Sequence, residues 1–359
     1  MRTVGSIVSP WVDTICVGGG SLALLLCFFL INDPALVSAD VRTHPWLEPV
    51  KLWLATLVNM PHFLASYRMV YRSRETILKH PWAAIYVPLI LAVYSGWAVW
   101  LAQHDPTWIW ALYMVSGTYL AWHYTGQAWG MMATYAHLGG AGFDRLEAQL
   151  IRGGLRILLA WHVTWFLYIE VPPWRGWLAP LLKLLTAGMA VAFVLGVAGF
   201  ARYRARHGRL PPARALVAWA AIFVWYLALF RNPGAIFWVQ IAHALQYLIF
   251  PFRVEANRAT ASGAAPDQVR THLAAFGVAL VVIGFLFMEF FPDHAEQFVK
   301  GFLGSEAGYA AMMAPTIFLN IHHYFTDGAI WKLRNPEVRA DLFAHLQPPT
   351  PGAAPPRAS

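Results

Sequence analysis

Six histidines lie within long apolar segments of the sequence, where ionisable side chains are costly: His62, His123, His162, His243, His322 and His323. Imidazole nitrogens are good ligands for iron, zinc and copper. The two cysteines, Cys16 and Cys27, lie in one apolar run and do not form a cysteine metal site. The histidines therefore predict an imidazole-based metal site within a membrane.

Several of these histidines have polar neighbours three residues before or four residues after them. The motifs are Asn59-x2-His62-x3-Ser66, Gln240-x2-His243-x3-Tyr247, Asn320-x2-His323-x3-Asp327 and His123-x3-Gln127. These positions share one face of a helix, and a metal-bound imidazole needs a polar partner for its second ring nitrogen. We therefore expect cofactor-binding or orienting roles for Asn59, Gln127, Gln240 and Asn320, and catalytic roles for Asp327 and Tyr247.

His162 and His322 fit this pattern less well. The positions around His162 hold Leu159 and Phe166. The spacing therefore does not decide whether His162 belongs to the site or is a packing residue. His322 and His323 are adjacent, and adjacent side chains on a helix point about 100° apart. The spacing therefore favours His323 as the ligand, with His322 kept as a candidate.

Four of the histidines are ten residues from a basic residue at one end of their segments: His62 before Arg72, His243 before Arg253, His322 before Lys332 and His162 after Arg152. Ten helical residues span about 15 Å, so these histidines are expected at a common depth, as a site with ligands from several helices requires. The alternative is that His, Asn and Gln only connect membrane helices by hydrogen bonds.

Apolar runs long enough to cross a membrane as helices recur along the chain and are expected to position these residues. They cover about 11–31, 50–71, 82–103, 107–134, 150–169, 176–200, 213–231, 234–252, 272–291 and 307–331. The fold class is therefore an all-α polytopic membrane bundle of about ten helices. We expect one transmembrane domain over 1–346 and a disordered Pro/Ala-rich tail over 347–359.

The distribution of basic residues predicts the orientation of these helices. Twenty Lys and Arg fall in one set of alternate connections and six in the other. Basic loops remain on the cytoplasmic side, so both termini are expected in the cytoplasm. A bacterial inner membrane is the expected location.

The overall composition supports the same class of protein. The chain has 359 residues, of which 58% are hydrophobic and 12% charged, whereas soluble domains carry about 25% charged residues. The net charge of +8 is accounted for by basic membrane-protein loops, so we expect no nucleic-acid partner. The expected partners are the membrane and an apolar small-molecule substrate.

The histidine motifs resemble those of the bacterial Brp/Blh family of membrane carotene dioxygenases. The similar segments are Met60-Pro61-His62, Trp122-His123, His243 within Ala-His-Ala-Leu-Gln-Tyr, and His322 with Asp327 within His-His-Tyr-Phe-Thr-Asp. The chain departs from the family pattern at Phe63 and Ser66, where the family has Gly and Asp, and at Tyr247, where it has a second His. The chain is also longer.

The resemblance implies a non-haem iron held by histidines from separate helices, and a dioxygenase that cleaves β-carotene to retinal. From the residues themselves, the leading hypothesis is a membrane-embedded, metal-dependent oxidoreductase that acts on a lipid or isoprenoid. Two alternatives use the same histidines. One is a haem-binding membrane electron carrier, and the other is a transporter with an intramembrane histidine site.

Overall fold

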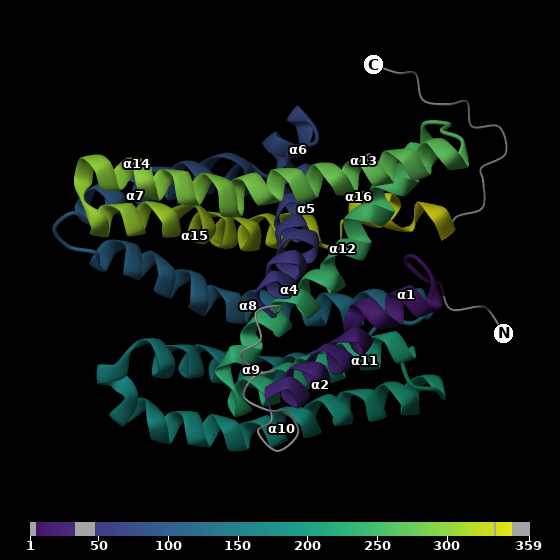
Figure 1. The fold of residues 1–359 in the computed structure, drawn as a ribbon. Helices are drawn as coiled ribbons and strands as arrows, with labels where there is room; N and C mark the ends of the chain where they lie inside the picture. The colour runs from purple at the N-terminus through teal and green to yellow at the C-terminus, as the bar shows by residue number, and fades with distance from the viewer. Residues whose placement is uncertain (1–4, 33–46, 334, 347–359) are drawn as a thin grey trace. The chain divides into compact units, whose positions relative to one another are not determined.

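The computed structural model describes residues 5–32, 47–333 and 335–346. Within these ranges the regular secondary structure is entirely helical, with no strand (Figure 1). The all-α prediction is therefore confirmed for the described chain, whereas the predicted tail over 347–359 lies outside the described residues. The chain groups into two compact units: unit 1 comprises Met1–Leu47 and Met114–Gln246, and unit 2 comprises Glu48–Tyr113 and Tyr247–Ser359.

Unit 1 is built on antiparallel helix packing. Helices α9 and α10 lie side by side, and Gly154 permits their close approach, because a β-carbon there would lie 2.5 Å from the carbonyl oxygen of Ala192. The elements are α1 (Pro10–Thr14), η1 (Ile15–Gly19), α2 (Gly20–Asn32), α8 (Thr107–Leu138), α9 (Arg145–Glu170), η4 (Pro172–Trp174), α10 (Arg175–His207), α11 (Ala213–Arg231), η5 (Pro233–Ala235) and α12 (Ile236–Ala261). Helix α8 begins in unit 2, and α12 ends there.

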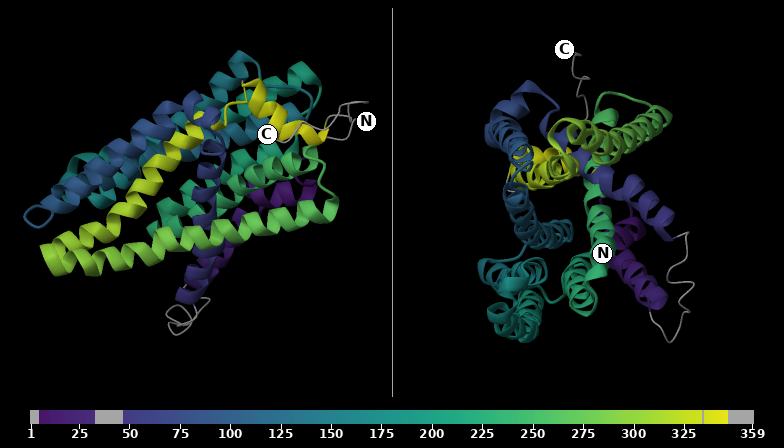
Figure 2. Two further views of the ribbon diagram at one scale, coloured as in Figure 1. Left: turned by 90° about the horizontal axis from the view of Figure 1, so that it is seen from above. Right: turned by 60° about the vertical axis from the view of Figure 1, so that its left-hand side comes forward.

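Unit 2 contains a long rod formed by α13, η6 and α14, along which α15 returns in the opposite direction (Figures 1 and 2). Gly304 makes this reversal with φ of 90°, a conformation that favours glycine. The elements are α4 (Leu47–Leu54), η2 (Ala55–Asn59), α5 (Met60–Val70), α6 (Arg74–Lys79), η3 (Trp82–Tyr86), α7 (Val87–Leu101), α13 (Pro266–Phe285), η6 (Leu286–Phe290), α14 (Phe291–Leu303), α15 (Ser305–Ile330), α16 (Pro336–Phe343) and η7 (Ala344–Leu346).

Three widened π-helical turns in unit 2 end two residues before a proline. They are η2, η3 and η6, followed by Pro61, Pro88 and Pro292. A proline inside a helix has no N–H, and its ring clashes with the carbonyl four residues earlier, so the helix widens there. The carbonyls of these turns then accept hydrogen bonds from side chains. Ala84 of η3, four residues before Pro88, accepts from the hydroxyl of Tyr71 at 2.8 Å.

Six helical segments of the described chain are long and apolar enough to cross a membrane. They are Pro10–Phe29, Trp82–Leu101, Pro172–His207, Ala213–Arg231, Pro233–Ala261 and Pro266–Leu303. The other predicted segments, 50–71, 107–134, 150–169 and 307–331, are helical too but do not meet the same criterion. These four carry all the candidate histidines except His243, because polar side chains lower the mean hydropathy of the helices that bear them.

Candidate metal centre

His62 lies on the first turn of α5, directly after the π-helical turn η2. Its ring is buried, and its Nδ1 donates to the backbone carbonyl of Asn59. A carbonyl oxygen only accepts hydrogen bonds, so Nδ1 carries the proton and the neutral ring has its lone pair on Nε2. Asn59 therefore orients this imidazole as predicted by position, but through its backbone and not through its side-chain amide.

Ser66 is the centre of a buried polar cluster in unit 2. Its hydroxyl oxygen lies 2.7 Å from the hydroxyl of Tyr247, 2.8 Å from Nδ1 of His323 and 2.7 Å from Oδ1 of Asp327. Ser66, His62 and His323 are at most 2% exposed. We call His62, Ser66, Tyr247, His323 and Asp327 the unit 2 cluster.

The directions of the hydrogen bonds in this cluster follow from Asp327. Its carboxylate only accepts, so Ser66 donates its single proton to Asp327 and must accept from both Tyr247 and Nδ1 of His323. Tyr247 in turn accepts from the indole N–H of Trp331 at 2.9 Å. Nδ1 of His323 therefore carries a proton, and the lone pair of the neutral ring lies on Nε2.

His323 has two neighbours in the unit 2 cluster that offer ligand atoms for the same metal ion. Nε2 of His323 lies 3.4 Å from Oδ2 of Asp327, one helical turn later on α15. Two ligand atoms about 2.1 Å from one ion, at angles of 90–110°, are about 3.0–3.4 Å apart. Ring nitrogens of His62 and His323 lie within 4.8 Å of each other. Two imidazoles and one carboxylate thus form a candidate set of three ligands.

His322 has a different environment from its neighbour His323. Its Nε2 donates to the carbonyl of Ala83 in η3 at 2.6 Å, and its Nδ1 accepts from the hydroxyl of Tyr67 at 2.9 Å. Both ring nitrogens are therefore used by protein groups, as expected of a residue that connects α15 to α5 and η3. The half-buried side chain of Asn320 makes no hydrogen bond to a histidine ring among the described residues.

Unit 1 contains a second arrangement, the unit 1 histidine pair of His123 and His243. Their Nε2 atoms lie 3.0 Å apart, and both rings are buried. This is also the separation of two neighbouring ligands on one ion, estimated at about 3.0 Å for a right angle. The ring of Tyr124 packs against His243 with 4.5 Å between ring centroids. The pair can therefore share one proton or hold one metal ion.

The other predicted residues of unit 1 lie around this pair. Gln127 donates from its amide to the backbone carbonyl of His243 at 3.0 Å and to Gln246 at 3.1 Å, so it fixes the backbone of α12 and does not contact an imidazole nitrogen. Nδ1 of His162 lies 3.1 Å from the hydroxyl of Tyr226. Gln240 is half-buried, and its side chain does not hydrogen-bond to a histidine ring of the described chain.

The spacing motifs did not identify Trp331, which donates a hydrogen bond to Tyr247 of the unit 2 cluster. The signal was present, because Trp331 follows Asp327 by four residues, as Asp327 follows His323. Nor did they identify Pro61 as the residue that accompanies the widened turn before His62.

Comparisons with models of protein families, with curated proteins and with solved structures found no match for this chain.

Proposed function

We propose that the chain is a membrane-embedded oxidoreductase that binds non-haem iron at His62, His323 and Asp327. The observation that carries the proposal is the buried position of His323, whose Nε2 lies 3.4 Å from Oδ2 of Asp327 and which has a ring nitrogen within 4.8 Å of one of His62. Two histidines and one carboxylate, with further positions open, are the ligand set of non-haem iron oxygenases. Iron bound there would supply oxygen activation.

The residues around the ligands have separable tasks in this proposal. The carbonyl of Asn59 orients His62, and Ser66 orients His323. Tyr247 holds a proton on its hydroxyl next to Ser66, and its ring packs in an apolar cluster with Ala65, Phe276 and Leu280. These apolar neighbours exclude water from the proposed site, which suits chemistry on a hydrocarbon substrate. The resemblance to carotene dioxygenases supports an isoprenoid as that substrate, with a lipid acyl chain as the other member of the class.

The proposed activity predicts oxygen incorporation into an isoprenoid. The protein, loaded anaerobically with ferrous iron in lipid nanodiscs, is mixed with β-carotene under ¹⁸O₂. We expect labelled cleavage products by mass spectrometry, and none from the His323→Ala variant. A parent protein that binds iron but oxidises neither β-carotene nor the lipids of the disc would contradict the proposed activity.

We also propose that His123 and His243 can bind a metal ion. A haem between them is disfavoured, because two imidazole nitrogens on opposite sides of one iron are separated by about 4 Å, whereas their Nε2 atoms are 3.0 Å apart. In a titration with ferrous iron, His123→Ala and His243→Ala are expected to bind less metal than the parent. Unchanged binding in both variants would leave the pair as a hydrogen bond.

For the membrane topology we propose ten spans with both termini in the cytoplasm of a bacterial inner membrane. The bias of basic residues and the helicity of all ten predicted segments support this arrangement. A reporter enzyme that is active only outside the cytoplasm, fused after Ser359, is expected to give no signal, whereas the same reporter fused after Lys300 is expected to give one. The opposite pattern would reverse the topology.

A further inference from the structure

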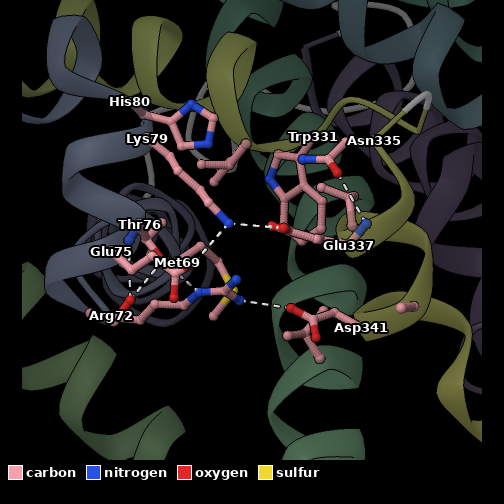
Figure 3. A pocket seen from close by; sticks show the side chains of 15 residues that line it. Met69, Arg72, Glu75, Thr76, Lys79, His80, Trp331, Asn335, Glu337 and Asp341 are labelled. Carbon is pink, nitrogen blue, oxygen red and sulfur yellow. Dashed lines mark hydrogen bonds and ion pairs between the residues drawn. The ribbon is translucent and has the colours of Figure 1, made fainter.

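Unit 2 contains a polar cavity of about 400 Å³ next to the cluster but separated from it (Figure 3). One wall is formed by the end of α5 and by α6, with Arg72 and Lys79. The opposite wall is formed by α16, with Glu337 and Asp341. Charged side chains line both walls, so the cavity suits water and small polar solutes and is unsuited to a hydrocarbon.

Ion pairs that cross this cavity hold α16 in place. Nζ of Lys79 lies 2.8 Å from Glu337, and Arg72 lies 2.7 Å from Asp341, as the dashed lines in Figure 3 show. The side chains of Lys79 and Glu337 are 43% and 58% exposed. Exposed ion pairs contribute little to stability and are weakened by salt, so the start of α16 is held weakly.

The far end of α16 is held more firmly. Leu342 is fully buried, and Asn257 donates to the backbone carbonyls of Asp341 and Leu342 at 2.8 and 3.1 Å. The exposed pair of Lys79 and Glu337 holds the start of α16, whereas Asp341 at its buried end pairs with both Arg72 and Arg258. A short helix held in this way can open about its buried end. Opening would widen the cavity without unfolding the rest of unit 2.

Trp331 separates the cavity from the unit 2 cluster. Its side chain lines the cavity, and its indole N–H donates to Tyr247, whose hydroxyl contacts Ser66. An indole N–H has no lone pair with which to accept a proton in return, so this hydrogen bond cannot relay protons. We therefore expect water from the cavity to reach the hydroxyl of Tyr247 when the indole moves.

We propose that the cavity is an aqueous vestibule that admits water and protons to the unit 2 cluster, with α16 as its lid and Trp331 as its inner gate. The role of the admitted protons rests on the proposed oxygen chemistry, whereas access itself is a property of the chain without metal. The proposal separates two steps: salt-sensitive opening of α16, and movement of one indole ring.

The test uses metal-free protein in nanodiscs, in a background with Cys16→Ser and Cys27→Ser. Met69→Cys places a thiol on the wall of the cavity, and Ser66→Cys places one behind Trp331. The probe is a small cationic methanethiosulfonate reagent, and the rate of modification is measured by mass spectrometry. Size-exclusion profiles identify the variants that retain the fold.

The expected rates distinguish the lid from the gate. Met69→Cys should react faster at high salt, and this dependence should disappear with Glu337→Gln. Ser66→Cys should react slowly, and at least about tenfold faster with Trp331→Ala, because the thiol no longer depends on a local opening of the wall. Trp331→Phe, which keeps a ring but loses the N–H, should give an intermediate rate.

Trp82→Ala is the matched control, because this indole is 67% exposed and lies elsewhere in unit 2. It should leave both rates unchanged. The proposal is overturned if Ser66→Cys reacts equally fast with and without Trp331, or if Met69→Cys shows no dependence on salt in the parent background. Because no iron is present, these outcomes do not depend on whether the chain is an oxygenase.

Discussion

His323→Ala is expected to abolish iron binding at the unit 2 cluster, whereas His322→Ala is expected to retain it. The two residues are neighbours on α15, but Nε2 of His323 lies 3.4 Å from the carboxylate of Asp327, and both nitrogens of His322 bond to other protein groups. Loss of an orienting residue weakens metal binding about 10–100-fold, and loss of a ligand should cost more. The measurement is a titration of each purified variant with ferrous iron against a competing chelator.

The control variant, His322→Ala, is itself expected to lower the stability of the fold. Removing the imidazole of His322 leaves the hydroxyl of Tyr67 and the carbonyl of Ala83 without their present partner, which costs about 1–3 kcal/mol for a buried group. His322→Ala should therefore unfold at lower temperature in detergent while it still binds iron. If His322→Ala loses iron and His323→Ala keeps it, the assignment of the ligand is wrong.

Ser66→Ala is expected to weaken iron binding about 10–100-fold without abolishing it. The serine hydroxyl accepts from Nδ1 of His323 and donates to Asp327, so its removal frees both proposed ligands to rotate. The ligand atoms themselves remain. The same chelator competition measures the change, and a loss as large as that of His323→Ala would indicate that Ser66 has a larger role than orientation.

A second buried serine provides a matched control. Ser95 on α7 is 8% exposed, and its hydroxyl has no hydrogen-bond partner within the part of unit 2 that the structure describes. Ser95→Ala makes the same chemical change away from the cluster and should leave iron affinity unchanged. Equal effects of Ser66→Ala and Ser95→Ala would show that any loss reflects general destabilisation.

Much of the helical architecture could be predicted from the sequence, because apolar runs bounded by Pro, Gly and charged residues are local signals. Each predicted segment falls on helix, although six segments of the described chain meet the criterion for crossing a membrane. The remaining four are more polar. A hydropathy average counts every polar residue as unfavourable in a membrane span. His62 and His323 are buried against other helices, and their hydrogen bonds there offset the unfavourable free energy of placing them in the span.

The partners of the imidazoles could be predicted only in part. Spacing along one helix placed Asp327 beside His323, because positions four apart are neighbours on a helix. It also pointed to the amide side chains of Asn59 and Asn320, but His62 bonds instead to a backbone carbonyl of a widened turn. Helical spacing compares side chains with one another and does not include hydrogen bonds from a side chain to a backbone carbonyl.

The contacts of Ser66 were beyond any argument from local spacing. Its hydroxyl joins Tyr247, 181 residues later, and His323, 257 residues later. Ser66 and Tyr247 are also two of the positions at which the chain departs from the family that its motifs resemble. Their hydroxyl oxygens lie 2.7 Å apart.

The most direct test of the central proposal is the iron content of the parent protein, loaded anaerobically with ferrous iron and freed of excess metal, together with its absorbance spectrum. We predict at least one iron per chain in the parent, loss of iron from the unit 2 cluster in His62→Ala, His323→Ala and Asp327→Ala, and no intense Soret band of a haem. A parent chain that binds no iron, or that carries its iron as haem, would contradict the proposed non-haem iron centre.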